Sequence, residues 1–399
     1  MRRPLRAAAV TLALGFAVAA CAGLGVRAPA ADPSAAGPAE SRPAAEPGQP
    51  TTAANGASPS PAPNPPTDEV AIDETGSDKD EIDDGAETPG PPIQGQIYKH
   101  PLDGWNKGQI EAELMLNPAA LGSMSIGFTN AGALYNGVQM PEGDAWEVVD
   151  ADHAWGTDET IDYLSRCIRR VAEQFPTTPR MFIGHISGPR GGHLSPHVSH
   201  QAGRDVDVSY YYTADQTRWY LRANASNLDR ARTWSFLKAL VTDTDVELVL
   251  MDRGVQTLVR QYAVEHGEDR AWVDQLFDGT AALPPLVRHA KGHATHIHVR
   301  FYNPIAQETG RRAYEVLLRR RIIQPPSYFV RHKVREGETL GHLAKKYRVP
   351  AKAIQQANGL KSSLIRASHD YKIPQRGGVK ACPRALIPMR RTPPGQSTG

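Results

Sequence analysis

The chain has 399 residues, of which 40% are hydrophobic and 22% are charged, so it is long enough for more than one domain. Its formal net charge of +2 hides an uneven distribution, because residues 68–87 contain ten acids and one lysine while the rest of the chain sums to +11. A basic body favours an anionic polymer as a partner, and the export signal described next argues against nucleic acid.

Residues 1–20 have the pattern of a secretory signal. Three arginines precede an apolar stretch that is too short to span a membrane as a helix. The segment from Val18 to Cys21 resembles a bacterial lipobox, which predicts removal of residues 1–20 and attachment of lipid at Cys21. Ala22 follows instead of an aspartate, which predicts a periplasmic protein anchored to the outer membrane of a Gram-negative bacterium. An ordinary cleavage site beside an incidental cysteine is the alternative.

Residues 21–92 consist mostly of Ala, Pro, Ser, Gly and acids, with almost no large apolar side chain. Such a segment cannot bury enough surface to offset its ordering entropy, so we expect a disordered tether with a reach of roughly tens of ångströms. We also expect a basic disordered tail at residues 377–399. The two remaining cysteines, Cys167 and Cys382, leave two alternatives open, a disulfide between them or a buried free thiol at Cys167.

Ordered sequence is expected from residue 93 to residue 327. The clearest helix covers residues 158–175, because its apolar residues fall on one face and Thr157 precedes it as a cap. Further helices are expected at residues 229–242 and 255–262, and strands at residues 181–186, 205–212, 246–251 and 296–301. Elements mixed in this way, without regular βαβ alternation, indicate an α+β domain with a small antiparallel sheet and flanking helices.

Two stretches about ninety residues apart carry most of the chemistry. The first contains His200-x6-Asp207 and the second contains His296-x-His298. Zinc favours imidazole and carboxylate ligands, and three protein ligands leave a fourth position for water. The alternation of a strand points both imidazoles of the second stretch to one face, and Gly203 permits a tight turn before Asp207. A histidine cluster that only satisfies hydrogen bonds in a core is the alternative.

The two stretches together resemble a known family. Ser199-His200-Gln201-x-Gly203-x-Asp205-x-Asp207, followed by Gly292-His293-x-x-His296-x-His298-Val299-Arg300, looks like penicillin-insensitive murein endopeptidase over about residues 98–303. That family belongs to a zinc group that also holds lysostaphin-type peptidases and D-Ala-D-Ala carboxypeptidases. The resemblance implies a single Zn²⁺ ion with the ligands His200, Asp207 and His298. It also implies that the other active-site histidines are His197, His293 and His296.

Physical chemistry assigns compatible roles to the residues around these ligands. His296 is placed to accept the proton of the attacking water or to stabilise the oxyanion. His293 and His197 are expected to share that duty or to bind substrate carboxylates. Asp205 is expected either to orient an imidazole through its distal N–H or to be a surface residue. Arg300 is expected either to pair with a carboxylate of a stem peptide or to be an exposed strand residue.

The residues before the His-x-His motif separate two branches of the zinc group. The carboxypeptidase branch carries a glutamate there as its general base, whereas this chain has Lys291 and Gly292 nearby. This difference favours an endopeptidase.

Residues 329–376 form a separate pattern of strand, two short helices and strand. The turn from Gly337 to Leu340, the helix with Leu343 and Tyr347, and Asn358 make this segment resemble a LysM module. The resemblance implies a βααβ fold that binds glycans containing N-acetylglucosamine, such as peptidoglycan.

Together these features predict a zinc-dependent murein endopeptidase that hydrolyses D-alanyl to meso-diaminopimelyl cross-links. Stem peptides are expected at the catalytic domain and glycan at the LysM module, while a lipid holds the chain at the membrane and raises its effective concentration at the wall. Two other functions stay open, a non-catalytic peptidoglycan-binding lipoprotein and a D,D-carboxypeptidase that trims stem peptides.

Overall fold

The computed structural model describes residues 95–96, 98–213, 217–376 and 384–395. The expected signal at residues 1–20, the lipid site Cys21 and the expected tether at residues 21–92 lie outside the described residues. Among the helices of the described ranges, none combines the length and the apolar character needed to cross a membrane.

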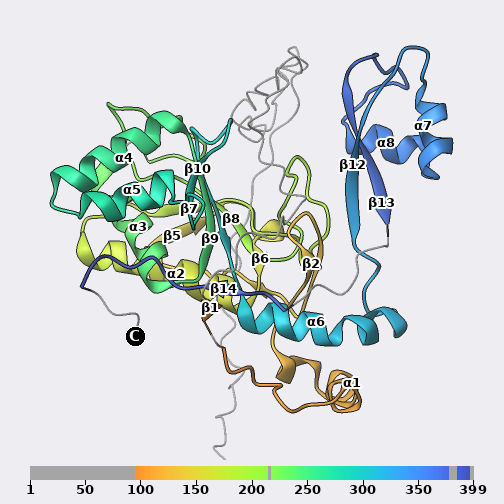
Figure 1. The fold of residues 1–399 in the computed structure, drawn as a ribbon, viewed down its shortest axis with the longest axis horizontal. Helices are drawn as coiled ribbons and strands as arrows, with labels where there is room; N and C mark the ends of the chain where they lie inside the picture. Colours follow the sequence, from red (N-terminus) through yellow and green to blue (C-terminus); the bar gives the residue numbers. More distant parts are fainter. Residues whose placement is uncertain (1–94, 97, 214–216, 377–383, 396–399) are drawn as a thin grey trace, which may run out of the picture. The chain divides into compact units, whose positions relative to one another are not determined.

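A six-stranded sheet lies at the centre of the larger described part of the chain (Figure 1). In spatial order its strands are β10 (Val287–His289), β9 (Val246–Met251), β11 (Ile297–Phe301), β8 (Asp205–Val208), β7 (Met181–Ile183) and β5 (Trp146–Val148). The four central strands pair antiparallel, whereas β10 with β9 and β7 with β5 pair parallel. The predicted α+β class is confirmed, and the sheet is mixed because of these two outer pairs.

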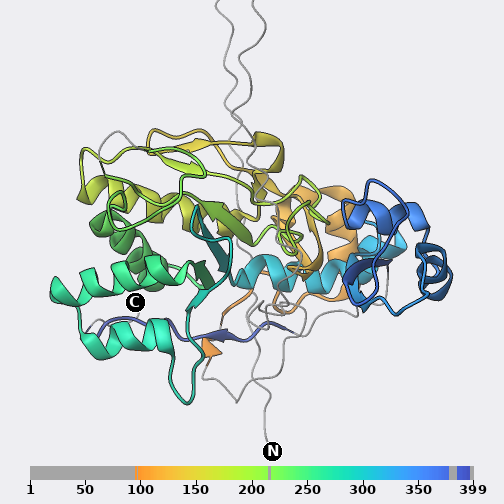
Figure 2. The same ribbon diagram turned by 90° about the horizontal axis from the view of Figure 1, so that it is seen from above.

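Four helices pack to one side of this sheet (Figure 1, Figure 2). They are α2 (Asp158–Gln174), α3 (Arg230–Asp243), α4 (Arg253–Glu265) and α5 (Arg270–Asp278). Thr157 caps α2 as predicted, since its hydroxyl accepts a hydrogen bond from the N–H of Thr160. The apolar faces of these helices form one hydrophobic core with the apolar residues of the sheet, which leaves the other face of the central strands available for polar side chains.

A second, smaller core joins a β-hairpin to two further helices. β2 (Met124–Phe128) pairs antiparallel with β3 (Ala131–Tyr135), and α6 (Pro304–Arg319) packs on β2 together with α1 (Lys107–Leu116) and the short 3₁₀ helix η1 (Pro118–Leu121). Gly310 makes this packing possible, because a Cβ there would lie 2.3 Å from the carbonyl oxygen of Ser125. The short strands β4 (Val138–Gln139) and β6 (Trp155–Gly156) also pair, and the 3₁₀ helix η2 (Ala151–His153) precedes β6.

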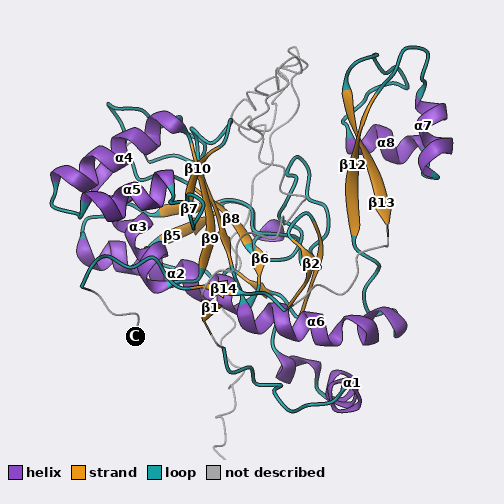
Figure 3. Cartoon of the chain, in the orientation of Figure 1, coloured by secondary structure: helices purple, strands orange, loops and turns teal. Residues whose placement is uncertain are grey.

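Residues 327–376 form the predicted βααβ unit (Figure 3). β12 (Ser327–Lys333) pairs antiparallel with β13 (Asp370–Arg376), and α7 (Leu340–Tyr347) and α8 (Ala351–Ala357) lie between them in the sequence. The unit has its own hydrophobic core. Asn358 fastens the end of α8 to β13, because its side chain donates to the carbonyl oxygen of Lys372 and accepts from the N–H of the same residue, both over 2.7 Å.

The structure describes residues 384–395 of the expected tail, whereas residues 377–383 and 396–399 lie outside the described residues. β14 (Ile387–Pro388) pairs antiparallel with β1 (Gly95–Gln96). The indole N–H of Trp272 donates to the carbonyl oxygen of Arg391 over 2.6 Å. These contacts join part of the expected tail to segments that lie far away in the sequence.

Cys167 lies on the inner face of α2 and is fully buried, and this burial raises the pKa of its thiol. Cys382 lies outside the described residues. Both alternatives from the sequence, a Cys167–Cys382 disulfide and a buried free thiol at Cys167, therefore stay predictions.

Candidate metal centre

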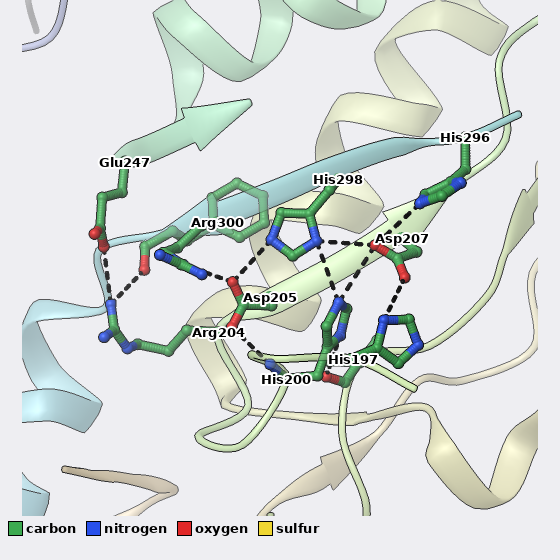
Figure 4. Close-up of polar contacts among 11 residues, drawn as sticks. His197, His200, Arg204, Asp205, Asp207, Glu247, His296, His298 and Arg300 are labelled. Atoms are coloured by element: carbon green, nitrogen blue, oxygen red, sulfur yellow. Dashed lines mark hydrogen bonds and ion pairs between the residues drawn. The ribbon is translucent and has the colours of Figure 1, made fainter. Parts of the chain in front are cut away.

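The pairing of β8 with β11 brings the two histidine-containing stretches together. The valines of β8 belong to the main core, so the alternating Asp205 and Asp207 point to the opposite face. In the antiparallel register, His298 stands directly opposite Asp207, and Arg300 stands opposite Asp205. Because directly opposite residues share one face of a sheet, all four side chains meet on the polar face (Figure 4).

A tight turn before β8 places His200 beside these residues. His200 has a φ of 65° and Gly203 has a φ of 69°, a left-handed region that strongly favours glycine. A Cβ on Gly203 would also lie 2.8 Å from Cδ1 of the buried Leu134. The N–H of His200 donates to Oδ2 of Asp205 over 3.1 Å and holds the turn on the strand. The turn expected at Gly203 is therefore present, and a side chain there would have to displace Leu134.

His200, Asp207 and His298 bring three buried donor atoms close together. His200 Nε2 lies 3.3 Å from Asp207 Oδ1 and 3.2 Å from His298 Nδ1. His298 Nδ1 lies 3.0 Å from the same carboxylate oxygen. In a tetrahedral zinc site with bonds of about 2.0–2.1 Å, two ligand atoms are about 3.3 Å apart. The spacing and the mixed donor set fit one cation of the zinc type.

Each of the two imidazoles is held at its other nitrogen (Figure 4). His200 Nδ1 lies 3.0 Å from the carbonyl oxygen of Ile186, so this nitrogen carries a proton and donates it. His298 Nε2 lies 3.0 Å from Asp205 Oδ1. Hydrogen bonds of this kind fix the tautomer and orient the ring. They leave His200 Nε2 and His298 Nδ1 as the inward-facing nitrogens.

Asp205 and Arg300 form a buried ion pair beside the cluster. Arg300 Nε donates to Asp205 Oδ1 over 2.6 Å, and both side chains are nearly inaccessible to solvent. Of the two roles that the sequence left open for Asp205, this geometry matches contact with an imidazole. For Arg300 the structure contradicts the alternative of an exposed strand residue, since the side chain is buried and its Nε donates to Asp205.

The buried charges of the cluster are strongly coupled. Burial alone would raise the pKa of Asp207, but the neighbouring imidazoles, His200 first, outweigh burial and hold the pKa well below its usual range. The Arg300 guanidinium likewise outweighs burial and lowers the pKa of Asp205. Hydrogen bonds to these two carboxylates outweigh burial at His298 and raise its pKa to about 9. The site therefore holds two carboxylate charges that favour a cation, which on binding would displace a proton.

His197 and His296 flank the carboxylate group of Asp207, and His293 lies beside His296. His197 Nδ1 lies 3.6 Å from Asp207 Oδ2, and His296 Nε2 lies 4.0 Å from Asp207 Oδ1. The ring centroid of His293 is 4.7 Å from that of His296. Burial lowers the pKa of His197 and His293 to about 3 and also lowers the pKa of His296. The structure thus gathers all three predicted histidines as neutral bases next to the donor cluster.

Two residues that contact these histidines, Tyr220 and His185, were not among the site residues predicted from the sequence. Tyr220 stacks its ring on His296, with centroids 5.6 Å apart and planes at 15°. His185 Nδ1 lies 2.8 Å from His197 Nε2. His185 follows β7 at the end of an apolar run, and only the pairing of β7 with β8 brings it here. The only local sign that His185 belongs to the site is that a polar ring stands at the end of a buried strand.

Comparison with known proteins adds two family matches and a set of relatives. Residues 125–316 match the family model of penicillin-insensitive murein endopeptidase, and residues 332–367 match that of the LysM domain. The chain is 26% identical over 208 residues to the penicillin-insensitive murein endopeptidase of Pectobacterium atrosepticum, across 47% of this chain and 68% of the relative. The protein of that name from Haemophilus influenzae is 26% identical over 181 residues, across 41% and 58% of the two chains. The one from Escherichia coli O1:K1 is 25% identical over 207 residues, across 47% and 69%.

Proposed function

We infer that this chain, whose residues 125–316 belong to the penicillin-insensitive murein endopeptidase family and whose residues 332–367 form a LysM domain, is a zinc-dependent endopeptidase that cleaves peptide cross-links of peptidoglycan. The observation that carries this proposal is the set of three buried donor atoms 3.0 to 3.3 Å apart, with neutral imidazoles beside it. A protein that only bound the wall would not need a ligand set with an open position and adjacent bases.

We propose that His200, Asp207 and His298 hold the zinc ion and that Asp205 orients His298. Zinc bound there supplies a water of lowered pKa, about 7, and polarises the scissile carbonyl. The donor set of two imidazoles and one carboxylate suits zinc better than magnesium or calcium, which prefer oxygen ligands alone.

The proposed proton acceptor is His296. Thr295 Oγ1 lies 3.0 Å from His296 Nδ1 and can accept the proton of that nitrogen, which leaves Nε2 free on the side of Asp207. His293 Nδ1 lies 3.2 Å from the carbonyl oxygen of Lys291, so its Nε2 is also free to take up a proton. Two adjacent neutral bases suit a reaction in which a proton moves from water to the leaving amine.

We assign His197 to positioning within the site. Its Nδ1 faces Asp207 and its Nε2 faces His185, so both ring nitrogens have partners inside the protein. Because both ring nitrogens are already engaged, His197 is better placed to orient Asp207 than to bind a carboxylate of the substrate.

Peptidoglycan is the proposed substrate for two reasons. The relatives are named for action on murein, and the LysM domain is proposed to bind its N-acetylglucosamine-containing glycan strand. The absence of a glutamate before the His-x-His motif favours cleavage of a cross-link, with the D-alanyl to meso-diaminopimelyl bond as the proposed target. Attachment to the outer membrane through Cys21, with residues 21–92 as a tether in the periplasm, completes the proposal.

The test is digestion of purified cross-linked sacculi, followed by identification of the released muropeptides by mass. Full-length wild type, His200→Ala and wild type with a chelator are compared. His266→Ala is the matched control, because His266 is exposed and its ring bonds to Tyr262 of its own helix. We expect cross-linked dimers to disappear with wild type and control and to persist with His200→Ala and after chelation. Binding to sacculi without any product would refute the proposal, and free D-alanine released from intact dimers would indicate a carboxypeptidase.

A further inference from the structure

A second cluster of potential metal ligands adjoins His197, which also lies beside the proposed zinc ligand Asp207. Asp150 Oδ2 lies 2.7 Å from His153 Nδ1 and 3.5 Å from His185 Nε2. One donor atom from each of the three residues lies within 4.8 Å of the others. None of the three takes part in the proposed peptidase reaction.

The backbone builds this cluster from two neighbouring strands. β5 and β7 pair parallel, with Val148 opposite Ile183, so both strands end at the same edge of the sheet. Asp150 and His185 each follow the last residue of their strand by two positions. The carbonyl oxygen of His153 accepts hydrogen bonds from two consecutive N–H groups, those of Ile186 and Ser187, over 2.8 and 3.0 Å. The three side chains therefore project from a fixed frame, as a binding site requires.

We propose that Asp150, His153 and His185 form a second binding site for a divalent transition-metal ion of the zinc class. Two imidazoles and one carboxylate make a three-ligand set that such ions favour over magnesium or calcium. The side chains are 29% to 40% exposed, so an ion and its remaining water ligands can reach them without movement of the chain.

A simple ion pair between neighbours explains only part of this geometry. Asp150 and His153 are three residues apart, and their contact alone would need no third partner. His185 comes from another strand, yet its Nε2 is directed at the same oxygen of Asp150. The two imidazoles, which come from different segments, and the carboxylate thus place three ligand-type atoms within 4.8 Å of one another, a donor set that a zinc-type ion can bind.

The position of His185 allows it to bind an ion without giving up its contact with His197. Its Nε2 faces Asp150, while its Nδ1 lies 2.8 Å from His197 Nε2. An imidazole that binds a metal through one nitrogen keeps its proton on the other, where it is commonly fixed by a hydrogen bond. His185 would therefore donate from Nδ1 to His197, whose own Nδ1 faces Asp207. The second site is thus connected to the first by side chains that are already in contact.

The test counts zinc ions per chain in the full-length protein, by elemental mass spectrometry after dialysis against a low excess of ZnCl₂. We expect two ions in wild type and in the control His266→Ala, and one ion in His200→Ala, in His153→Ala and in Asp150→Asn. The double variant His153→Ala with His200→Ala should bind none. Asp150→Asn keeps Oδ1, which accepts the N–H of Asp152, so the local turn is expected to persist.

The number of bound ions does not depend on peptidase activity, so this experiment tests the second site separately from the proposed endopeptidase function. One ion in wild type together with none in His200→Ala would overturn the second site and leave the first intact. Two ions retained in both His153→Ala and Asp150→Asn would also overturn it. Circular dichroism and thermal melting identify any variant that is unfolded, and His153→Gln, which keeps a polar side chain of similar reach, then replaces His153→Ala.

Discussion

Replacement of Asp205 by asparagine should weaken zinc binding without removing a proposed ligand. Asp205 Oδ1 accepts from His298 Nε2 and from Arg300 Nε, and Oδ2 accepts from the N–H of His200. Asparagine has nearly the same shape, but one of its two terminal groups is a donor. In either orientation of the amide, this NH₂ group faces an N–H group, so at least one contact becomes repulsive.

The size of the effect follows from two contributions. Loss of a partner that orients a ligating imidazole typically lowers metal affinity about 10- to 100-fold, which is about 1.4–2.7 kcal/mol. Arg300 also stays buried, at 5% exposure, after its carboxylate partner has lost its charge. Disruption of a buried ion pair typically costs about 3–5 kcal/mol. We expect a 10- to 100-fold higher Kd for zinc and a free energy of unfolding lower by about 3 kcal/mol.

The assay combines competition for zinc with a chromogenic chelator and unfolding in urea. Asp245→Asn is the matched control, because Asp245 is also buried and accepts from Arg390 Nε over 3.0 Å and from the Tyr163 hydroxyl over 2.9 Å, away from the cluster. The control should lose stability and keep wild-type zinc affinity. Wild-type affinity in Asp205→Asn would refute the positioning role. An equal loss of affinity in both variants would show that the loss reflects general destabilisation.

Three further predictions concern the proton acceptor, the turn before β8 and the pH dependence of stability. His296→Ala should lower the rate of sacculus digestion about 10²- to 10⁴-fold while the zinc content stays unchanged; a near wild-type rate would exclude His296 as the proton acceptor. Gly203→Ala should lower the free energy of unfolding in urea more than Gly267→Ala does. Both glycines have a positive φ, so alanine costs about 1 kcal/mol of backbone strain at either position, but only at Gly203 does the added Cβ also meet a side chain. Equal losses would contradict the steric argument. Burial raises the pKa of Glu159 from 4.5 to about 7, so the native state binds this proton more tightly than the unfolded chain, and stability should fall as pH rises from about 4.5 to about 7. Glu159→Gln should remove that part of the slope, and an unchanged slope would show that another group causes it.

Prediction from the sequence was most accurate for elements whose formation depends on a local pattern of residues. α2 has an apolar face and a capping threonine, so its expected range of 158–175 agrees with the observed Asp158–Gln174. The expected strand at 246–251 coincides with β9. The two histidine-containing motifs contain three donor residues, His200, Asp207 and His298, whose donor atoms the fold brings within 3.3 Å of one another.

Features that depend on distant pairing were beyond local patterns. α6 begins at Pro304 and contains Gly310, a poor helix former, yet this glycine is what permits packing on β2. His185 has no neighbour of ligand type in the sequence. Its contact with Asp150 arises from the parallel pairing of β5 with β7, two strands separated by the whole of α2, and its contact with His197 arises from the pairing of β7 with β8. The pairing of β14 with β1 likewise joins opposite ends of the described chain.

The β1–β14 pair changes how the LysM domain is connected to the rest of the protein. In the sequence, residues 377–399 follow this domain. Residues on both of its flanks contact the larger part of the chain, since α6 belongs to the second core and Arg390 and Arg391 bond to Asp245 and Trp272. Topologically it is an inserted domain with two points of attachment. Truncation after residue 376 would therefore remove the partner strand of β1 and the contacts of Arg390 and Arg391 with Asp245 and Trp272. A clean removal of the LysM domain should instead excise the insert and rejoin the two flanks.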